Sequence, residues 1–83
     1  MKIFDYRNKL LLIDQLIRLS ATGTPKELAN KLDICEASVY NLLFIIKELA
    51  FEQDADVKFD RCRLLYYYTK PLKLYFGFKL LNE

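Results

Sequence analysis

The chain has 83 residues, a hydrophobic fraction of 53% and a formal net charge of +2. This length supports one domain whose small core is compensated by dense apolar content. With no histidine and only 2 cysteines, the chain lacks the ligands of a zinc site and the usual proton shuttle, so we expect no metal, no cofactor and no enzymatic activity. The apolar runs are too short to span a membrane and no signal-peptide pattern is present, which predicts a cytoplasmic protein.

Charge is distributed unevenly along the chain. Residues 1–56 contain seven Lys or Arg against nine Asp or Glu, whereas residues 57–83 contain six against two. The C-terminal third is therefore the basic part of the chain, and it is also rich in aromatic residues.

The first predicted element is a helix over residues 5–21. Asp5 is a suitable N-cap, and Leu10, Ile13 and Ile17 recur at helical spacing. Gly23 can adopt the left-handed conformation that commonly ends a helix. Further leucines widen the apolar stripe, so this helix is either buried on two sides or part of an interface.

Residues 24–50 predict two helices joined by a tight turn. Thr24 and Glu27 have the spacing of a capping box, and Pro25 falls at the first helical position, where its missing N–H costs nothing. The first of these helices runs to about Leu32. The second covers residues 37–49, with an apolar face at helical spacing: Val39, Leu42, Leu43, Ile46 and Leu49.

Residues 57–81 predict β-structure. Two short strands flank a polar turn that contains Arg61 and Arg63, which is typical of a hairpin. Residues 72–80 then alternate strictly between apolar and other side chains. A period of two over nine residues predicts a third, half-buried strand.

A helix, a capped helix, a tight turn, another helix and a basic hairpin together resemble the winged helix-turn-helix domains of bacterial transcription regulators, in particular the small biotin-repressor-like type. The motif that carries the resemblance is matched at Leu28, Ala29, Leu32, Ile34, Ser38, Val39 and Tyr40. The fold that this resemblance implies is α+β, with a three-helix core, a C-terminal hairpin wing and an extra C-terminal strand. It would form a single domain over residues 1–83.

The resemblance implies binding to double-stranded DNA. The third helix would enter the major groove by its N-terminal residues, and the wing would hold the phosphate backbone. Asn41 suits adenine, since its amide can pair with N6 and N7 together. The full set of expected DNA-binding residues is Lys26, Ala37, Ser38, Tyr40, Asn41, Lys47, Lys58, Arg61 and Arg63.

Two features favour a different use of the same fold. Lys47 is the only basic residue of the predicted third helix, and residues 42–46 are five apolar residues in a row. A core this small cannot take all five, so some must meet either the C-terminal strand or a second copy of the chain. The residues expected at such a homodimer interface are Phe44, Ile45, Leu74, Phe76 and Phe78.

The sequence therefore predicts a small transcription regulator that binds specific duplex DNA. The alternative is a protein–protein interaction module on a winged helix scaffold without DNA binding.

Overall fold

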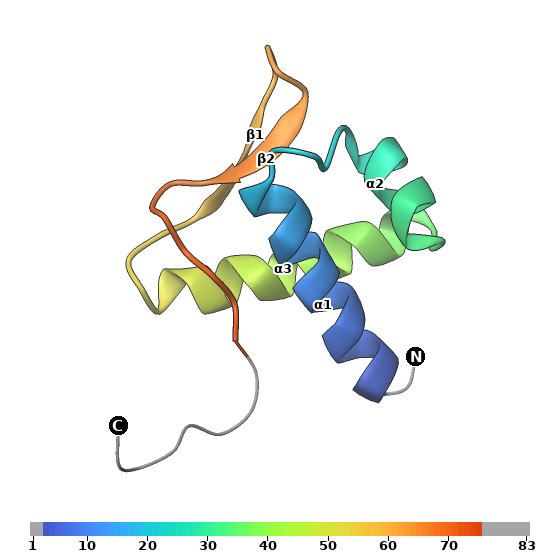
Figure 1. The fold of residues 1–83 in the computed structure, drawn as a ribbon, viewed down its shortest axis with the longest axis horizontal. Coiled ribbons are helices and arrows are strands. Elements are labelled where there is room, and N and C mark those ends of the chain that lie inside the picture. The colour runs from blue at the N-terminus through green and yellow to red at the C-terminus, as the bar shows by residue number, and fades with distance from the viewer. Residues whose placement is uncertain (1–2, 76–83) are drawn as a thin grey trace.

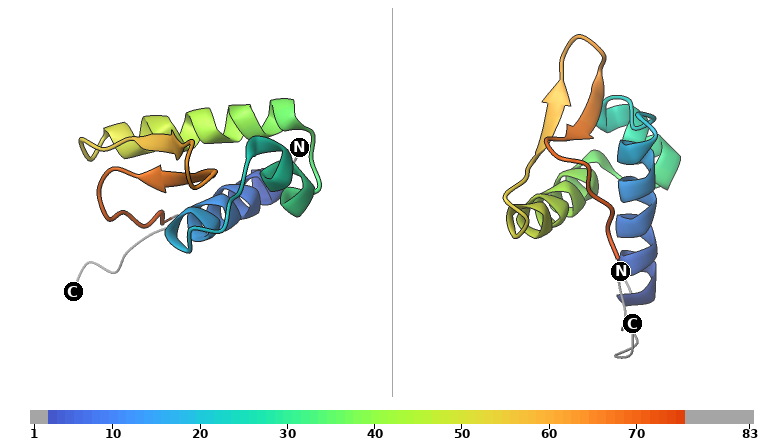
Figure 2. Two further views of the ribbon diagram at one scale, coloured as in Figure 1. Left: turned by 90° about the horizontal axis from the view of Figure 1, so that it is seen from above. Right: turned by 60° about the vertical axis from the view of Figure 1, so that its left-hand side comes forward.

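The computed structural model describes residues 3–75, over which the chain forms three helices followed by one β-hairpin (Figure 1). In chain order the elements are α1 (Ile3–Arg18), α2 (Pro25–Leu32), α3 (Glu36–Phe51), β1 (Val57–Asp60) and β2 (Leu65–Tyr68). The hairpin stands beside α1 and α3, and its tip projects away from them (Figure 2). The predicted α+β class is confirmed for this part of the chain. None of its helices is long and apolar enough to cross a membrane.

α1 contributes the apolar face that its spacing predicts. Leu10, Ile13 and Ile17 are all buried in the core. The predicted bounds of 5–21 are wrong at both ends: Asp5 lies inside the helix rather than capping it, and the helix ends at Arg18. It ends there because the next turn takes a left-handed residue, and that residue is Ser20 (φ 56°) rather than Gly23.

α2 begins at the predicted capping box. The Thr24 hydroxyl accepts from the Glu27 amide at 3.3 Å, and the Thr24 amide donates to the Glu27 carboxylate at 3.2 Å. Both amides would otherwise lack partners at the helix start. The helix ends at Asp33, whose φ of 56° is left-handed. This tight turn leads directly into α3.

α3 has one face in the core and one face outside. Its buried residues are Val39, Leu42, Leu43, Ile46 and Ala50. The helix is longer than the predicted 37–49, since it runs from Glu36 to Phe51. The two added C-terminal residues include Phe51, which lies on the outer side of the helix with 75% of it exposed.

β1 and β2 form the predicted antiparallel hairpin. Val57 lies opposite Tyr68 and Phe59 lies opposite Tyr66. Opposite residues of an antiparallel pair share a face, and this face meets the helices, because Val57 is buried and Tyr68 donates to Asp14 of α1.

The hairpin turn is held by its own backbone and by one carboxylate. Asp60 accepts from the amides of Cys62 at 2.9 Å and Arg63 at 3.1 Å, and its carbonyl accepts from the Leu64 amide at 2.7 Å. Arg61 and Arg63 therefore sit on a closed turn at the tip.

A buried polar cluster joins α1 to β2. Asp14 is only 1% exposed, and its carboxylate accepts from Tyr68 Oη at 2.6 Å and from Arg18 Nε at 3.0 Å. Thr22 is 0% exposed and its hydroxyl accepts from the Tyr66 amide at 2.9 Å. This hydrogen bond connects residues 21–23 to β2 of the hairpin.

The predicted third strand over residues 72–80 is wrong for residues 72–75, which form no strand. Leu72 and Leu74 do face inward against the core, and Lys73 and Tyr75 are exposed, as the alternation predicts. The chain leaves the hairpin after β2 and passes alongside the C-terminal half of α3 (Figure 1). The alternation thus reflects an extended segment on a helical surface, without a partner strand. The rest of the predicted strand lies outside the described residues.

Candidate nucleic-acid interface

Helical spacing places four residues together on the outer face of α3. Ala37 lies three residues before Tyr40 and four before Asn41, and Phe44 lies four and three residues after them, so all four share one side of the helix. All four are exposed, with Tyr40 at 53% and Phe44 at 62%. The buried face lies on the opposite side, which leaves these side chains accessible to a partner.

Ser38 lies apart from this outer face. It is half-buried, and its Oγ lies 3.3 Å from the Sγ of Cys35, the residue that precedes α3. The hydrogen bonds from the Ser38 hydroxyl and amide lower the pKa of the exposed Cys35 thiol. Ser38 thus contacts the residue that precedes α3, although no side chain caps this helix.

A groove separates α3 from the hairpin. Its volume is about 520 Å³, and its lining residues are Tyr40, Leu43, Phe44, Lys47, Asp56, Val57, Lys58, Phe59 and Tyr66. Phe59 and Tyr66 pack across the hairpin with ring centroids 4.9 Å apart. Burial, with a smaller effect of Tyr40, raises the pKa of Tyr66 and keeps its hydroxyl protonated. Four of the nine lining residues are aromatic, and the charged ones are Lys47, Asp56 and Lys58.

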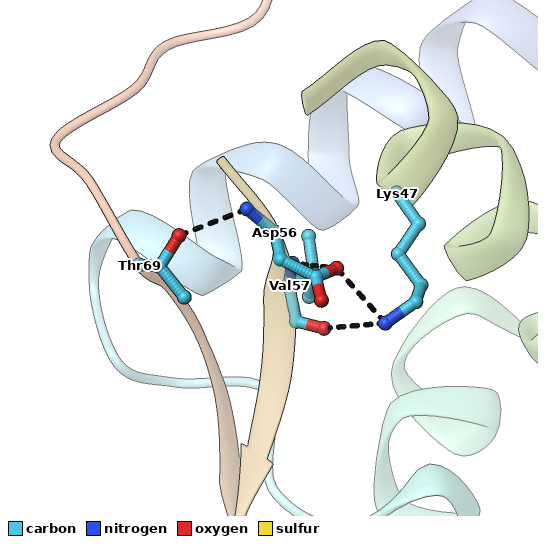
Figure 3. Close-up of polar contacts among 4 residues, drawn as sticks. All are labelled: Lys47, Asp56, Val57 and Thr69. Carbon is cyan, nitrogen blue, oxygen red and sulfur yellow. Dashed lines mark hydrogen bonds and ion pairs between the residues drawn. The ribbon is translucent and has the colours of Figure 1, made fainter. Parts of the chain in front are cut away.

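Lys47 is held within this groove by hairpin atoms (Figure 3). Its ammonium forms an ion pair with the Asp56 carboxylate at 2.9 Å and donates to the Val57 carbonyl at 3.2 Å. The hydrogen bond from Lys47 is the main reason why the pKa of Asp56 lies below its usual value. Thr69 accepts from the Asp56 amide at 2.9 Å and fixes the same corner. Lys47 joins α3 to β1.

The other predicted basic residues lie in three places outside α3. Lys26 is exposed at the start of α2, and Lys58 is exposed on β1 beside the groove. Arg61 and Arg63 are exposed on the hairpin turn. Arg63 lies toward α2, because it lines a second hollow with Glu27. Within the described residues, Lys26, Arg61 and Arg63 form no ion pair.

Of the residues predicted for a homodimer interface, the three that the structure describes, Phe44, Ile45 and Leu74, do not form one exposed surface. Phe44 is exposed, but Ile45 and Leu74 are half-buried and pack against the core. Phe76 and Phe78 lie outside the described residues.

Two aromatic residues were missed by the sequence analysis. Phe51 follows Phe44 by seven residues, so helical spacing would have placed it on the same face if the helix had been extended beyond residue 49. Phe59 lines the groove, but its alternation with Lys58 indicated only a core-facing strand position. Among the described residues, no three acidic or cysteine side chains come together as a metal site requires.

No protein-family model matches the chain, and neither the curated proteins nor the solved structures contain a significant match to it.

Proposed function

We propose that this chain is a winged helix-turn-helix domain that binds duplex DNA as a small bacterial transcription regulator in the cytoplasm. The observation that carries the proposal is the outer face of α3, whose first turns expose Tyr40 and Asn41, with Tyr40 lining a groove that Lys58 of the hairpin also lines. The α2–turn–α3 arrangement supports the same assignment, because it matches the bihelical element that places a second helix in the major groove.

In this proposal the side chains have separate roles. The N-terminal half of α3 meets base edges, with Asn41 as its principal hydrogen-bonding group. Lys26, Lys58, Arg61 and Arg63 meet phosphates on either side, which positions the helix without adding sequence information. Lys47 is left out of this set, because its ammonium is already bound by Asp56 and Val57.

A binding measurement on random duplex DNA at low salt tests the proposal. We expect association that weakens as salt is added, because phosphate contacts release counterions. The double variant Arg61→Ala, Arg63→Ala should bind more weakly. Its matched control is Lys73→Ala, which removes an exposed cation that lies over the Tyr75 ring, away from the hairpin turn. Absence of any retention on duplex at low salt would refute DNA binding.

One observation favours a second candidate, binding of a protein partner. Phe44 and Phe51 expose 62% and 75% of their surface on one side of α3. Large exposed apolar side chains in a row are typical of interaction surfaces. If α3 binds a second copy of the chain, Phe44→Glu should lower the oligomer size measured by light scattering and leave DNA retention absent in both proteins.

A further inference from the structure

The outer face of α3 exposes an unusual set of hydrogen-bonding groups for a helix that would lie in a major groove. α3 is described in full, and Lys47 is its one basic residue. Because Lys47 is bound to Asp56 at 2.9 Å, the outer face carries no free cationic donor. From its start to Phe44, α3 exposes the carboxylate of Glu36, the methyl of Ala37, the phenol of Tyr40, the amide of Asn41 and the ring of Phe44.

We propose that this face reads A·T base pairs, an inference that rests on the proposed DNA binding. Asn41 presents one donor and one acceptor, which match N7 and N6 of adenine in the major groove. Ala37 and Phe44 flank Asn41 at four residues before and three residues after it, on the same side of α3. Apolar side chains at those positions suit the C5 methyl groups of thymines in neighbouring pairs.

Guanine lacks a matching pair of donors on this face. Guanine offers two acceptors, O6 and N7, and these are met by the paired donors of Arg or by Lys. Arg61 and Arg63 are on the hairpin turn, not on α3. Two exposed carboxylates of α3 could accept from N4 of cytosine, Glu36 at the start of the helix and Glu48 one turn from its end. Neither carries the paired donors that guanine requires, so the guanine of a G·C pair has no counterpart on α3.

The first experiment selects bound duplexes from a random pool with the full chain. We expect an A·T-rich core in the selected sequences. A G·C-rich core would overturn the inference while leaving DNA binding intact. Selection of no sequences, together with no retention on random duplex, would remove both the inference and the proposed function.

The second experiment tests the thymine methyl groups directly. Every thymine of the selected duplex is replaced by deoxyuridine, which removes only the methyl. Wild type should lose roughly fourfold in affinity for each methyl that it buries. Phe44→Ala should lose less on the same replacement, because its contact is already absent. Phe51→Ala is the matched control, since Phe51 is equally aromatic and exposed but lies two turns further along α3.

The third experiment tests adenine recognition by Asn41. Replacing the core adenines by 7-deazaadenine removes the N7 acceptor, and wild type should lose roughly fivefold or more. Asn41→Ala should bind natural and modified duplexes equally. Both variants change exposed residues, so they should unfold at the wild-type temperature. If wild type, Phe44→Ala and Asn41→Ala all respond identically to the modified bases, the assignment to A·T pairs is wrong.

Discussion

Asp14 accepts the side-chain hydrogen bond that connects α1 with β2. It is buried to 1% exposure, so its carboxylate has lost almost all of its water. Tyr68 Oη at 2.6 Å and Arg18 Nε at 3.0 Å replace that water. A buried carboxylate is tolerated only with such partners, and removal of one partner leaves part of its desolvation cost uncompensated.

We therefore expect Tyr68→Phe to lower the free energy of unfolding by about 1.5–3 kcal/mol, the range for a hydrogen bond to a charged group. The measurement is urea denaturation followed by circular dichroism. Tyr67→Phe is the matched control, because Tyr67 is the neighbouring tyrosine on β2 and is 40% exposed. Equal destabilisation by the two changes would show that the bond to Asp14 contributes nothing.

The same tyrosine predicts a pH dependence. Burial, together with the hydrogen bond to Asp14, raises the pKa of Tyr68 above its usual value of 10.0. The folded chain therefore keeps a proton that the unfolded chain releases above about pH 10, so the free energy of unfolding should fall as pH rises beyond 10. Thermal unfolding between pH 8 and pH 11 measures this fall. It should be smaller in Tyr68→Phe, and an equal fall in both proteins would contradict the assignment.

At the scale of elements, all three helices end in the same way. The left-handed residues after α1, α2 and α3 are Ser20, Asp33 and Asp54, each with φ 56°. In each case the amide of the residue that follows donates a hydrogen bond to the carbonyl five residues earlier. The Ala21 amide, for example, donates to the Leu16 carbonyl at 2.9 Å. Glycine adopts this conformation without steric cost, whereas other residues are strained in it. None of the three positions is glycine, so strain is retained at each helix end.

Two substitutions beside α2 should have opposite signs. Ser20→Gly relieves left-handed strain and should raise the free energy of unfolding by about 0.5–1 kcal/mol. Gly23→Ala should lower it by more than about 1 kcal/mol, since Gly23 has φ 69° and an added Cβ would lie 3.0 Å from Glu27 Cβ and Cδ. Chemical denaturation of both variants tests the pair. A stabilising Gly23→Ala would mean that Glu27 moves aside at no cost.

Across the whole molecule, the features that the sequence could predict were those that depend on residues close together in the chain. The capping box of Thr24 and Glu27 depends on residues three apart, and it is found as predicted. The buried face of α3 and the hairpin follow from short-range spacing in the same way. The alternation was misassigned as a strand over residues 72–75, because a strand requires a distant partner. Periodicity reports only which side chains face the core.

The features of the candidate site fall into the same two groups, those that depend on local spacing and those that depend on distant contacts. Exposure of Tyr40, Asn41 and Phe44 follows from helical spacing, so the sequence could predict it. The pairing of Lys47 with Asp56 joins a helix to a strand, and no local pattern indicates it. The Asp14–Tyr68 bond, across 54 positions in the chain, was missed for the same reason.

The salt dependence of DNA binding reflects all the cations of the molecule that contact phosphates. If Lys26, Lys58, Arg61 and Arg63 each neutralise one phosphate, log K should fall with log salt with a slope of about −3.6. Lys58→Met should make this slope shallower by about 0.9, because Lys58 is exposed beside the groove. Lys47→Met is the matched variant from the opposite wall of that groove. It should leave the slope unchanged, because the Lys47 ammonium is occupied by Asp56 at 2.9 Å. An equal change of slope in both variants would mean that Lys47 exchanges Asp56 for a phosphate when DNA binds.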